Sequence, residues 1–405
     1  MIKKDKKIKE EKVSRRSFLK VATVAAGAAA ALGFPAVKRA SAQTPITLKM
    51  QSTWPTKDIF HEMFEKWAKK VNDMAGGRLK IDVLPTGAVV PAFELIEAVS
   101  RGTLDGGHGV PAYWFGRNRA VSLFGTGPSF GLDADGLLSW IYYGGGLELY
   151  NELIQDVLKM NVVSFFTGPM PTQPLGWYKS EIKKPEDLKD LRYRTVGLSA
   201  SLFMEMGAAV KIIPGGEIIP SMERGVLDAA EFNNMSSDKL LGFPDVRKIC
   251  MIQSYHQPCE FFELMFHKAK FDALPKDLQA ICKYAAYAQS SDMTWEFYKR
   301  NSDDMIEMEE KRGVKFITTP KSVLKAQLIA WDKIIEKESK ENPIFAKIIK
   351  SQREYAARAV RWREEVMVNN QMAYEHWFKK PPVKPAPKPA EKPAPKPAVK
   401  PPAKK

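Results

Sequence analysis

Two stretches of the chain repeat one pattern: a helical segment, an Arg-Gly pair and a short strand that contains Leu-Asp. They are AFELIEAVSRGTLDGGHG at 92–109 and GGEIIPSMERGVLDAAEF at 215–232. The glycine after the arginine lets the helix end and the strand begin. We interpret the two stretches as the same supersecondary piece, used once in each of two lobes. A chain built from two such units is predicted to have a cleft between them.

The surrounding sequence has the alternation that this interpretation requires. ITLKMQST (46–53) and RLKIDVLP (78–85) alternate as strands, and the segment between them, 57–77, has apolar residues at helical spacing. The later chain repeats the scheme, with strands at 161–168 and 192–196. Strands that alternate with helices favour parallel sheets covered by helices on both faces. The predicted fold class is therefore α/β.

The first 42 residues are typical of an export signal. They contain a lysine-rich start, the pair Arg15 and Arg16 in SRRSFLK, an Ala-rich apolar run, and ASA before Gln43. These features indicate a signal peptide for the twin-arginine route, cleaved after Ala42. A short membrane anchor is the alternative, but the run is shorter than the ~20 strongly apolar residues that span a bilayer. The mature chain is therefore expected in the periplasm.

The formal charge of +15 is concentrated at the two ends of the chain. Residues 1–42 contain 11 Lys or Arg and three Asp or Glu, and residues 379–405 contain nine Lys and one Glu. Each end therefore contributes +8, which leaves −1 for the body of the chain. A nearly neutral body has no basic face for phosphate groups, so binding to nucleic acid is excluded.

The Lys-Pro-Ala repeats of 379–405 cannot bury apolar surface and predict an extended polyproline II tether. The tail is either a solvated spacer or a segment that rests on an anionic surface.

Three cysteines, Cys250, Cys259 and Cys282, are too few for a disulfide framework. Three buried free thiols are expected, with one disulfide pair as the alternative.

Motifs of several enzyme classes are missing. The chain has no G-x-x-x-x-G-K, no G-x-G-x-x-G after a strand and no H-E-x-x-H among its five scattered histidines. We therefore predict a binding protein and no enzyme. A periplasmic enzyme that acts on a keto acid with Glu231 as general base, and a sensor that presents its ligand to a signalling partner, are the alternatives.

Several of these segments together resemble one receptor family. They are the export signal, STWP after the first strand, the two repeated pieces, and YHQPCEFFELMFHK at 255–268. The combination resembles the solute receptors of TRAP (tripartite ATP-independent periplasmic) transporters, closest to their α-keto-acid and monocarboxylate branch. The resemblance implies a two-lobed periplasmic binding protein with a cleft between its lobes and a long helix spanning both. Such a receptor delivers a small 2-oxo or 2-hydroxy monocarboxylate to membrane subunits.

The resemblance also implies a division of the chain. The expected parts are a signal peptide at 1–42, lobe 1 at 43–145 plus 231–268, lobe 2 at 146–230 plus 269–330, C-terminal helices at 331–378, and the tail at 379–405.

In this family an arginine of the second lobe holds the carboxylate through two nitrogens, and the matching position is Arg194 in LRYRTVG. Arg192 on the same strand is a competing assignment. The keto-acid branch places a cation beside the ligand, and the matching ligands are the side chains of Gln173 and Glu231 and the backbone carbonyl of Phe232. Oxygen ligands of this kind suit Na⁺ or Ca²⁺. An ordinary carboxylate paired with a lysine is the alternative for Glu231.

Further ligand-binding candidates lie near predicted strand ends. Trp54 and Tyr113 would wall the pocket, and Asn233 and His256 would contact a second group of the ligand. Trp114 and Asn234 are weaker candidates, and core packing is the alternative for both tryptophans and for the histidine.

The segment 342–378 predicts a long helix or helix pair with amphipathic patches. In the keto-acid receptors that the chain resembles, such a helix is exchanged between two subunits, so a homodimer is expected. A helix that folds back on its own lobe is the alternative.

Overall fold

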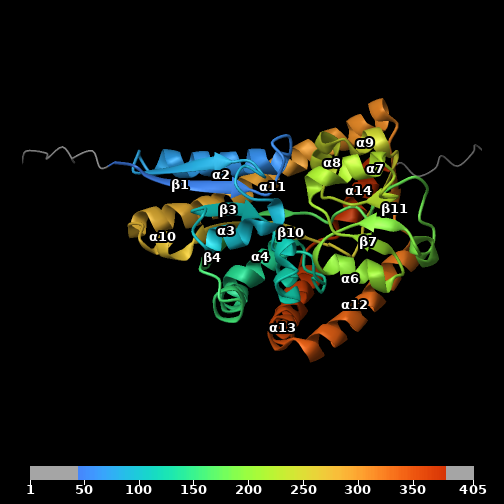
Figure 1. Cartoon of the computed structure of the whole chain (residues 1–405). Helices are drawn as coiled ribbons and strands as arrows, with labels where there is room; N and C mark the ends of the chain where they lie inside the picture. The colour runs from blue at the N-terminus through green and yellow to red at the C-terminus, as the bar shows by residue number, and fades with distance from the viewer. Residues whose placement is uncertain (1–43, 380–405) are drawn as a thin grey trace, which may run out of the picture.

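The computed structural model describes residues 44–379 and arranges them as two lobes, each built on one sheet (Figure 1). The first sheet has the strand order β2-β1-β3-β10-β4. Its strands are β1 (Ile46–Ser52), β2 (Leu79–Leu84), β3 (Gly106–Gly109), β4 (Val162–Met170) and β10 (Glu260–His267).

The second sheet has the order β11-β9-β5-β8-β6-β7. Its strands are β5 (Gly176–Tyr178), β6 (Arg192–Arg194), β7 (Ala209–Lys211), β8 (Ala229–Ala230), β9 (Ile249–Ile252) and β11 (Lys315–Thr318). The two-lobed α/β architecture predicted from the sequence is therefore confirmed.

Helices cover both sheets and connect their strands. The α-helices are α2 (Ile59–Met74), α3 (Leu95–Ser100), α4 (Ala134–Tyr143), α5 (Gly146–Asn151), α6 (Gly197–Glu205), α7 (Ile218–Glu223), α8 (Met235–Leu241), α9 (Phe243–Val246), α10 (Lys268–Asp272), α11 (Lys276–Arg312), α12 (Lys321–Glu341), α13 (Pro343–Val366) and α14 (Asn370–Phe378). Shorter helical turns are η1 (Ala92–Glu94), η2 (Pro111–Trp114), η3 (Arg119–Phe124), η4 (Glu152–Val157), η5 (Pro185–Leu188) and η6 (Gly215–Glu217).

The repeated sequence piece has the same local structure in both lobes. In each copy a 3₁₀ turn leads into a six-residue helix, α3 or α7, which ends at an arginine. The next residue, Gly102 or Gly225, has a φ of 75° or 70°. Because that left-handed conformation is unfavourable for residues with a Cβ, glycine is needed at both positions. This prediction from the sequence is confirmed.

The prediction of parallel sheets is wrong in part, because both sheets are mixed. β10 is antiparallel to β3 and β4, and β5 is antiparallel to β8 and β9. β1, β3 and β4 end at the edge of their sheet that faces the second lobe. The chain re-enters the first lobe at that edge when β10 begins, so β10 has to run in the opposite direction.

The lobe boundaries expected from the sequence need correction at two strands. β4 lies within 146–230, which was expected in lobe 2, but it pairs with β10 in the first sheet. β9 lies within 231–268, which was expected in lobe 1, but it pairs with β5 and β11 in the second sheet. The chain crosses between lobes after β4 and before β10, where strand pairing ends, and the helix pattern alone does not mark these positions.

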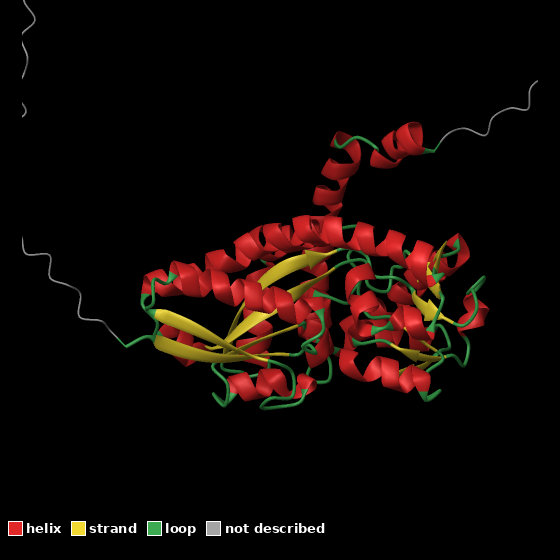
Figure 2. Ribbon diagram, turned by 90° about the horizontal axis from the view of Figure 1, so that it is seen from above, coloured by secondary structure: helices red, strands yellow, loops and turns green. Residues whose placement is uncertain are grey.

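The expected helix that spans both lobes is α11, a helix of 37 residues. It contacts α2 and β4 in the first lobe and α8 and α9 in the second, and Figure 2 shows a long helix running over both halves. α12 and α13 make a second connection, since α12 packs on α6 and α13 packs on α4 and α5. α12 begins at Lys321, ten residues before the expected start of the C-terminal helices.

The last helix stands apart from the rest of the fold. No residue of α14 is buried, and Figure 2 shows short helical segments projecting from the body.

None of the helices in 44–379 is long and apolar enough to cross a membrane. Cys250, Cys259 and Cys282 are buried free thiols, as predicted. The expected signal peptide and all of the tail after Lys379 lie outside the described residues.

Candidate functional site

A narrow cavity lies between the two lobes. It is lined by Trp54, Phe60, Val110, Tyr113, Arg194, Val196, Phe232, Asn233, Gln257 and Glu260. Five of the eight predicted ligand-binding residues are in this lining. Gln173 and Glu231 are not in the lining, but each forms a hydrogen bond with a lining residue. Gln173 bonds Glu260, and Glu231 bonds Arg194.

Strand ends place these side chains at the cavity. Arg194 is the last residue of β6, and Phe232 follows β8 by two residues. Trp54 follows β1 by two residues, and Tyr113 lies in η2, just after β3. Ligands of open α/β sheets bind outside the carboxyl ends of the strands. That rule indicated Phe232, Trp54 and Tyr113 in the sequence, whereas Arg194 was implied by the family resemblance.

Arg194 is buried, and most of its guanidinium is already held by the protein. Nε donates to the carbonyl of Ile213 at 2.9 Å, and Nη1 donates to both the backbone carbonyl and Oε1 of Glu231 at 3.0 Å. Nη2 has no hydrogen-bond partner among the described residues. The expected two-nitrogen grip on a carboxylate therefore does not match this arrangement, because only Nη2 is available.

Glu231 is completely buried and forms an ion pair with Arg194. This differs from the alternative of a carboxylate paired with a lysine. Burial raises the pKa of Glu231 to about 7, and the nearby Arg194 charge opposes that rise. Oε2 of Glu231 has no donor at hydrogen-bond geometry among the described residues, although the hydroxyl of Thr195 lies close enough to lower the pKa of the carboxyl. A buried carboxylate oxygen without a donor is costly, which indicates that a cationic or donor group belongs beside it.

Glu260, the first residue of β10, is a cavity residue that the sequence interpretation missed. Its Oε2 accepts hydrogen bonds from Nε2 of Gln173 and from Nδ2 of Asn233, both at 3.0 Å. Burial, and then the nearby charge of Glu231, raise the pKa of Glu260 to about 8. The only signal in the sequence is an acid directly before the apolar run FFELMF, at the start of a strand and not at its carboxyl end.

Gln173 lies in the crossing segment after β4 and is buried. While its Nε2 donates to Glu260, its Oε1 has no partner among the described residues. Buried acceptor oxygens without donors in the described chain therefore lie on Gln173, Glu231 and Gln257. Nη2 of Arg194 is a buried donor without an acceptor, and the hydroxyl of Tyr113 also has no partner there.

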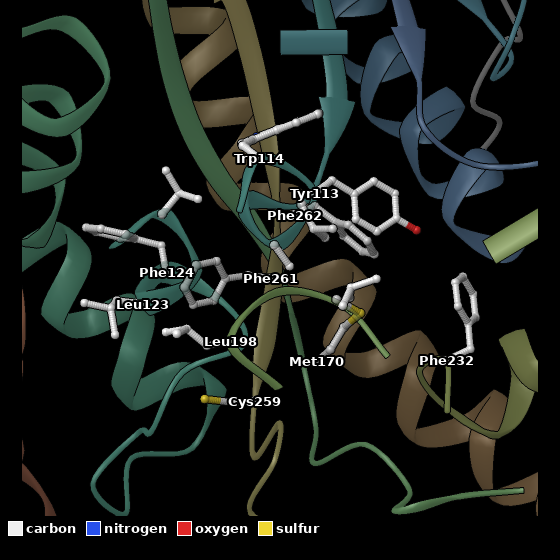
Figure 3. Packing of buried hydrophobic residues seen from close by; sticks show 14 of the residues in the cluster. Tyr113, Trp114, Leu123, Phe124, Met170, Leu198, Phe232, Cys259, Phe261 and Phe262 are labelled. Atoms are coloured by element: carbon white, nitrogen blue, oxygen red, sulfur yellow. The ribbon is translucent and has the colours of Figure 1, made fainter. Parts of the chain in front are cut away.

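Aromatic rings from both lobes wall the cavity. The Phe232 ring lies 6.4 Å from that of Trp54 and 6.0 Å from that of Phe60, and the Arg194 guanidinium lies over its face at 5.6 Å. Figure 3 shows Phe232 and Tyr113 on separate segments of the chain. Gly215 makes room for the ring, since a Cβ there would lie 2.4 Å from Phe232 Cε2.

Three candidates lie elsewhere. His256 is buried outside the cavity lining, where its Nδ1 bonds Oγ of Ser254 at 2.6 Å. Burial lowers its pKa to about 3, so it is a neutral core histidine. Trp114 is a core residue that donates to Glu263, and Asn234 caps α8. These positions correct the sequence-based expectation for His256 and support core packing for Trp114.

Arg192, the competing assignment for the clamp, is exposed. It pairs with Asp228 through two nitrogens, at 2.9 and 2.5 Å. The arginine at the cavity is therefore Arg194.

The residues present fit a hard cation. No group of three or more His, Cys, Asp or Glu within 44–379 is placed to hold a metal ion, so a cation here would need amide and backbone oxygens as well. Oε1 of Gln173 and Oε2 of Glu231 are such oxygens. The backbone carbonyl of Phe232 accepts no backbone hydrogen bond from the described chain. An oxygen-only set of this kind suits Na⁺ or Ca²⁺ and not a transition metal.

A second polar contact joins the lobes near the cavity. Asp58, the N-cap of α2, accepts a hydrogen bond at 3.0 Å from Oγ of Ser237 in α8. Burial raises the pKa of Asp58 to about 7, against the effect of its hydrogen bonds from Phe60 and Ser237. The lobes are therefore in contact through buried polar groups as well as through aromatic rings.

One segment matches a sequence motif of hydrolases but does not have the local structure that the motif has in those enzymes. GPSFG at 127–131 has the spacing G-x-S-x-G, but it lies in a loop after η3. The nucleophile of such enzymes needs a strand, a sharp turn and a helix around it. The segment therefore gives no support to the enzyme alternative.

Comparisons with known proteins show similarity to extracellular solute-binding proteins. A model of the family described as bacterial extracellular solute-binding protein, family 7 (DctP), matches residues 50–341. A relative from Nostoc sp. (strain PCC 7120), named monocarboxylate 2-oxoacid-binding periplasmic protein, is 27% identical over 369 residues. The match covers 90% of this chain and 99% of the relative.

Two solved structures are similar over most of the chain, each at 29% identity. One is a TRAP transporter solute-binding protein from Bordetella bronchiseptica RB50, with a TM-score of 0.77 and coverage of 82% of this chain and 98% of that chain. It is a mixed-occupancy dimer with copurified calcium and picolinate in one active site. The other, from Pseudoalteromonas atlantica T6c, holds sodium and pyruvate; its TM-score is 0.75, with coverage of 82% and 99%.

Proposed function

The chain belongs to bacterial extracellular solute-binding protein family 7, the family of TRAP transporter solute receptors, and we propose a substrate class for it. The protein binds a small 2-oxo or 2-hydroxy monocarboxylate together with Na⁺ or Ca²⁺ and delivers it to membrane subunits. One observation carries the proposal. Around a single buried cavity, Arg194 has a donor without an acceptor, while Gln173 and Glu231 have acceptors without donors.

The ligand carboxylate binds at Nη2 of Arg194. This nitrogen carries two hydrogens, and its charge strengthens hydrogen bonds to an anion. Nε and Nη1 stay bonded to Ile213 and Glu231, so the guanidinium is held in place before the ligand arrives. A donor that needs no rearrangement loses little entropy on binding.

Oε1 of Gln173, Oε2 of Glu231 and the carbonyl of Phe232 would hold the cation. When bound, it supplies positive charge for the ligand carboxylate and for the oxygen on the adjacent carbon. An acid with oxygens on two neighbouring carbons suits both the arginine and the cation. The cavity is narrow, which favours a small acid over a larger ligand.

The two lobes are expected to close on the ligand, because each lobe contributes part of the site. Arg194 and Phe232 come from the second lobe, and Trp54 and Tyr113 from the first. A ligand that contacts both sets binds the closed form more tightly than the open form and shifts the population towards it.

The receptor forms a homodimer through its C-terminal helices. α14 has no buried residue. Its large apolar side chains Met372, Trp377 and Phe378 are each at least 70% exposed. An isolated nine-residue helix is marginal in water, so these apolar side chains need a partner surface. The dimeric Bordetella structure is consistent with this arrangement.

The family is extracytoplasmic, and the chain reaches the periplasm by the twin-arginine route. SRRSFLK and the following Ala-rich run support this step. The membrane partners are the transporter subunits of the TRAP system.

The test measures the melting temperature of residues 43–405 with 2-oxo acids, 2-hydroxy acids, dicarboxylates and sugar acids, each with and without Na⁺ or Ca²⁺. A ligand that binds the native state raises the melting temperature by mass action. A cation-dependent rise with monocarboxylates is expected. A rise with dicarboxylates or sugar acids alone would overturn the substrate class. Recovery of pyruvate unchanged after incubation distinguishes a receptor from an enzyme.

A further inference from the structure

We propose that the Lys-Pro-Ala tail, residues 380–405, docks as a polyproline II segment on an exposed aromatic face of α11. This aromatic face consists of Tyr284, Tyr287, Trp295 and Tyr298. The inference goes beyond the proposed function, because it assigns a role to a surface and a segment that ligand binding leaves unused.

The aromatic face is a continuous stripe without charged residues. Its four rings follow one another along α11 at helical spacing, with Ser291 between Tyr287 and Trp295, so they lie on one side of the helix. Tyr284, Trp295 and Tyr298 are 60%, 70% and 80% exposed. Large rings gathered on the solvent side of a helix mark an interaction site.

The end of α4 extends this face. Tyr143, its last residue, is 86% exposed, and the ring of Tyr142 meets that of Tyr287 edge-on at 4.6 Å. Nζ of Lys283 lies 5.8 Å from the ring centres of both Tyr284 and Tyr287. Rings of the aromatic face therefore already hold one ammonium group, and cation–π contacts of the same kind are open to lysines of the tail.

A hollow beside Tyr298 supplies negative charge. Its lining includes Asp133, Asp135, Pro169, Pro171, Phe297 and Tyr298. Burial, and then the nearby charge of Asp133, raise the pKa of Asp135. A cation placed beside these two acids is therefore favourable. Aromatic-lined grooves are the usual docking sites of polyproline II segments, and the acids add a preference for a basic one.

The composition of the tail matches both features. It contains ten prolines, and its eight lysines and one glutamate give it a net charge of +7. Lysine recurs at every fourth residue from 380 to 404. A polyproline II segment is extended before it binds, so it docks on aromatic rings with little loss of entropy. The helix α14 of a second copy is the competing occupant, but 370–378 contains one Glu and no Lys or Arg to meet the acids.

The tail begins close enough to reach the face. Arg363 of α13 pairs with Asp133, which lines the hollow, and the short helical segments after it project on the side that the long helix covers (Figure 2). The tail follows Lys379, and its 26 residues span up to ~80 Å as polyproline II. The face from Tyr284 to Tyr298 is about 21 Å long. The tail can therefore return to the body and follow the whole stripe.

The test compares the mature chain, 43–405, with a chain that stops at Lys379. Hydroxyl-radical labelling of exposed side chains is measured by mass spectrometry in both, with Tyr255, 41% exposed beyond β9, as the internal reference. A flexible link gives the tail an effective concentration of about 1 mM, so a contact with a Kd below that covers the face more than half of the time. Labelling of Trp295 and Tyr298 should be at least about twofold lower in the mature chain, with Tyr255 unchanged. High salt should reduce this protection.

A second measurement separates the tail's conformation from its charge. A fluorescent peptide of residues 380–405 is titrated with the chain that stops at Lys379 and followed by anisotropy. Trp295→Ala should weaken binding by about two- to tenfold, whereas Tyr255→Ala should not. A peptide with each proline replaced by glycine keeps the charge and should bind more weakly than the natural one.

Equal labelling of Trp295 and Tyr298 in the two chains would overturn the inference. If that labelling is low in both and rises on dilution, the face is covered by a second copy of the chain instead. Equal affinity of the glycine-substituted peptide would reduce the contact to charge attraction and overturn docking as polyproline II.

Discussion

Arg194 donates two hydrogen bonds from one nitrogen to Glu231, one to its backbone carbonyl and one to its carboxylate, both at 3.0 Å. This pair leaves Nη2 of the arginine and Oε2 of the glutamate as buried polar atoms without partners in the described chain. One residue is thus prepared for an anion and its neighbour for a cation. A small acid bound together with its counter-ion satisfies both.

Replacing Arg194 by lysine should weaken binding of the acid. Lysine keeps the charge beside Glu231, so the fold should survive, but it loses the planar set of donors that includes Nη2. Hydrogen bonds to charged groups contribute about 1.5–3 kcal/mol, so we expect a loss of about 10- to 100-fold in pyruvate affinity by calorimetry. Arg192→Ala on the same strand is the control. Equal affinities for Arg194→Lys and the parent chain would contradict the clamp.

Replacing Gly215 by alanine should displace the aromatic wall. The new Cβ would lie 2.4 Å from the Phe232 ring, and overpacking of this kind costs about 1–3 kcal/mol. Pyruvate affinity should therefore fall by about tenfold or more, as the ring shifts into the cavity. Gly216→Ala is a matched control, because its nearest neighbour is Pro55 Cγ at 3.3 Å. If both variants bind pyruvate as the parent does, Phe232 does not form the wall.

The stability of the closed form should depend on pH through Asp58. Its pKa in the folded chain is about 7, well above the value of about 3.9 in an unfolded chain, so the folded state binds the proton more tightly. The free energy of unfolding then falls as the pH rises from about 4 to 7 and levels off above that window. Melting temperatures should follow the same course.

Asp58→Asn tests this contribution, because the amide keeps an acceptor for Ser237 but cannot titrate. Its melting temperature should change less between pH 4.5 and 7.5 than that of the parent chain. Asp73→Asn, an exposed change on the same helix, should give a profile parallel to that of the parent. A profile for Asp58→Asn that also parallels the parent would assign the pH dependence to other buried acids, such as Asp238.

Removing α14 should convert the dimer to a monomer. A chain that stops at Met367 lacks the helix whose side chains are all exposed, so its own lobes lose no buried contact. Mass measured by light scattering should halve, and pyruvate affinity should stay within about twofold because no residue of α14 lines the cavity. A chain that stops at Lys379 lacks only the tail and should stay dimeric. A monomeric parent chain would refute the proposed exchange of helices.

Local sequence patterns identified most of the architecture. The repeated helix, Arg-Gly turn and strand predicted two α/β units, since a glycine after a helix and alternating apolar residues act over a few neighbouring residues. The position of Phe232 at a strand end followed from the rule that ligands bind outside the carboxyl ends of strands, whereas Arg194 was implied by the family resemblance. His256 was placed wrongly, because a histidine near the site in sequence can still point its ring into the core.

The amino-acid sequence by itself determined the secondary structure, the two lobes and the residue types gathered at the strand ends. Only the tertiary structure decided which of those side chains reach the cavity and which hydrogen bonds they form. Glu260 reaches the cavity because β10 runs antiparallel and begins where its neighbours end. Three donors of Arg194 are used within the protein because Ile213 and Glu231 approach it from other segments. Strand direction and hydrogen-bond partners depend on contacts between distant segments, and no local pattern encodes them.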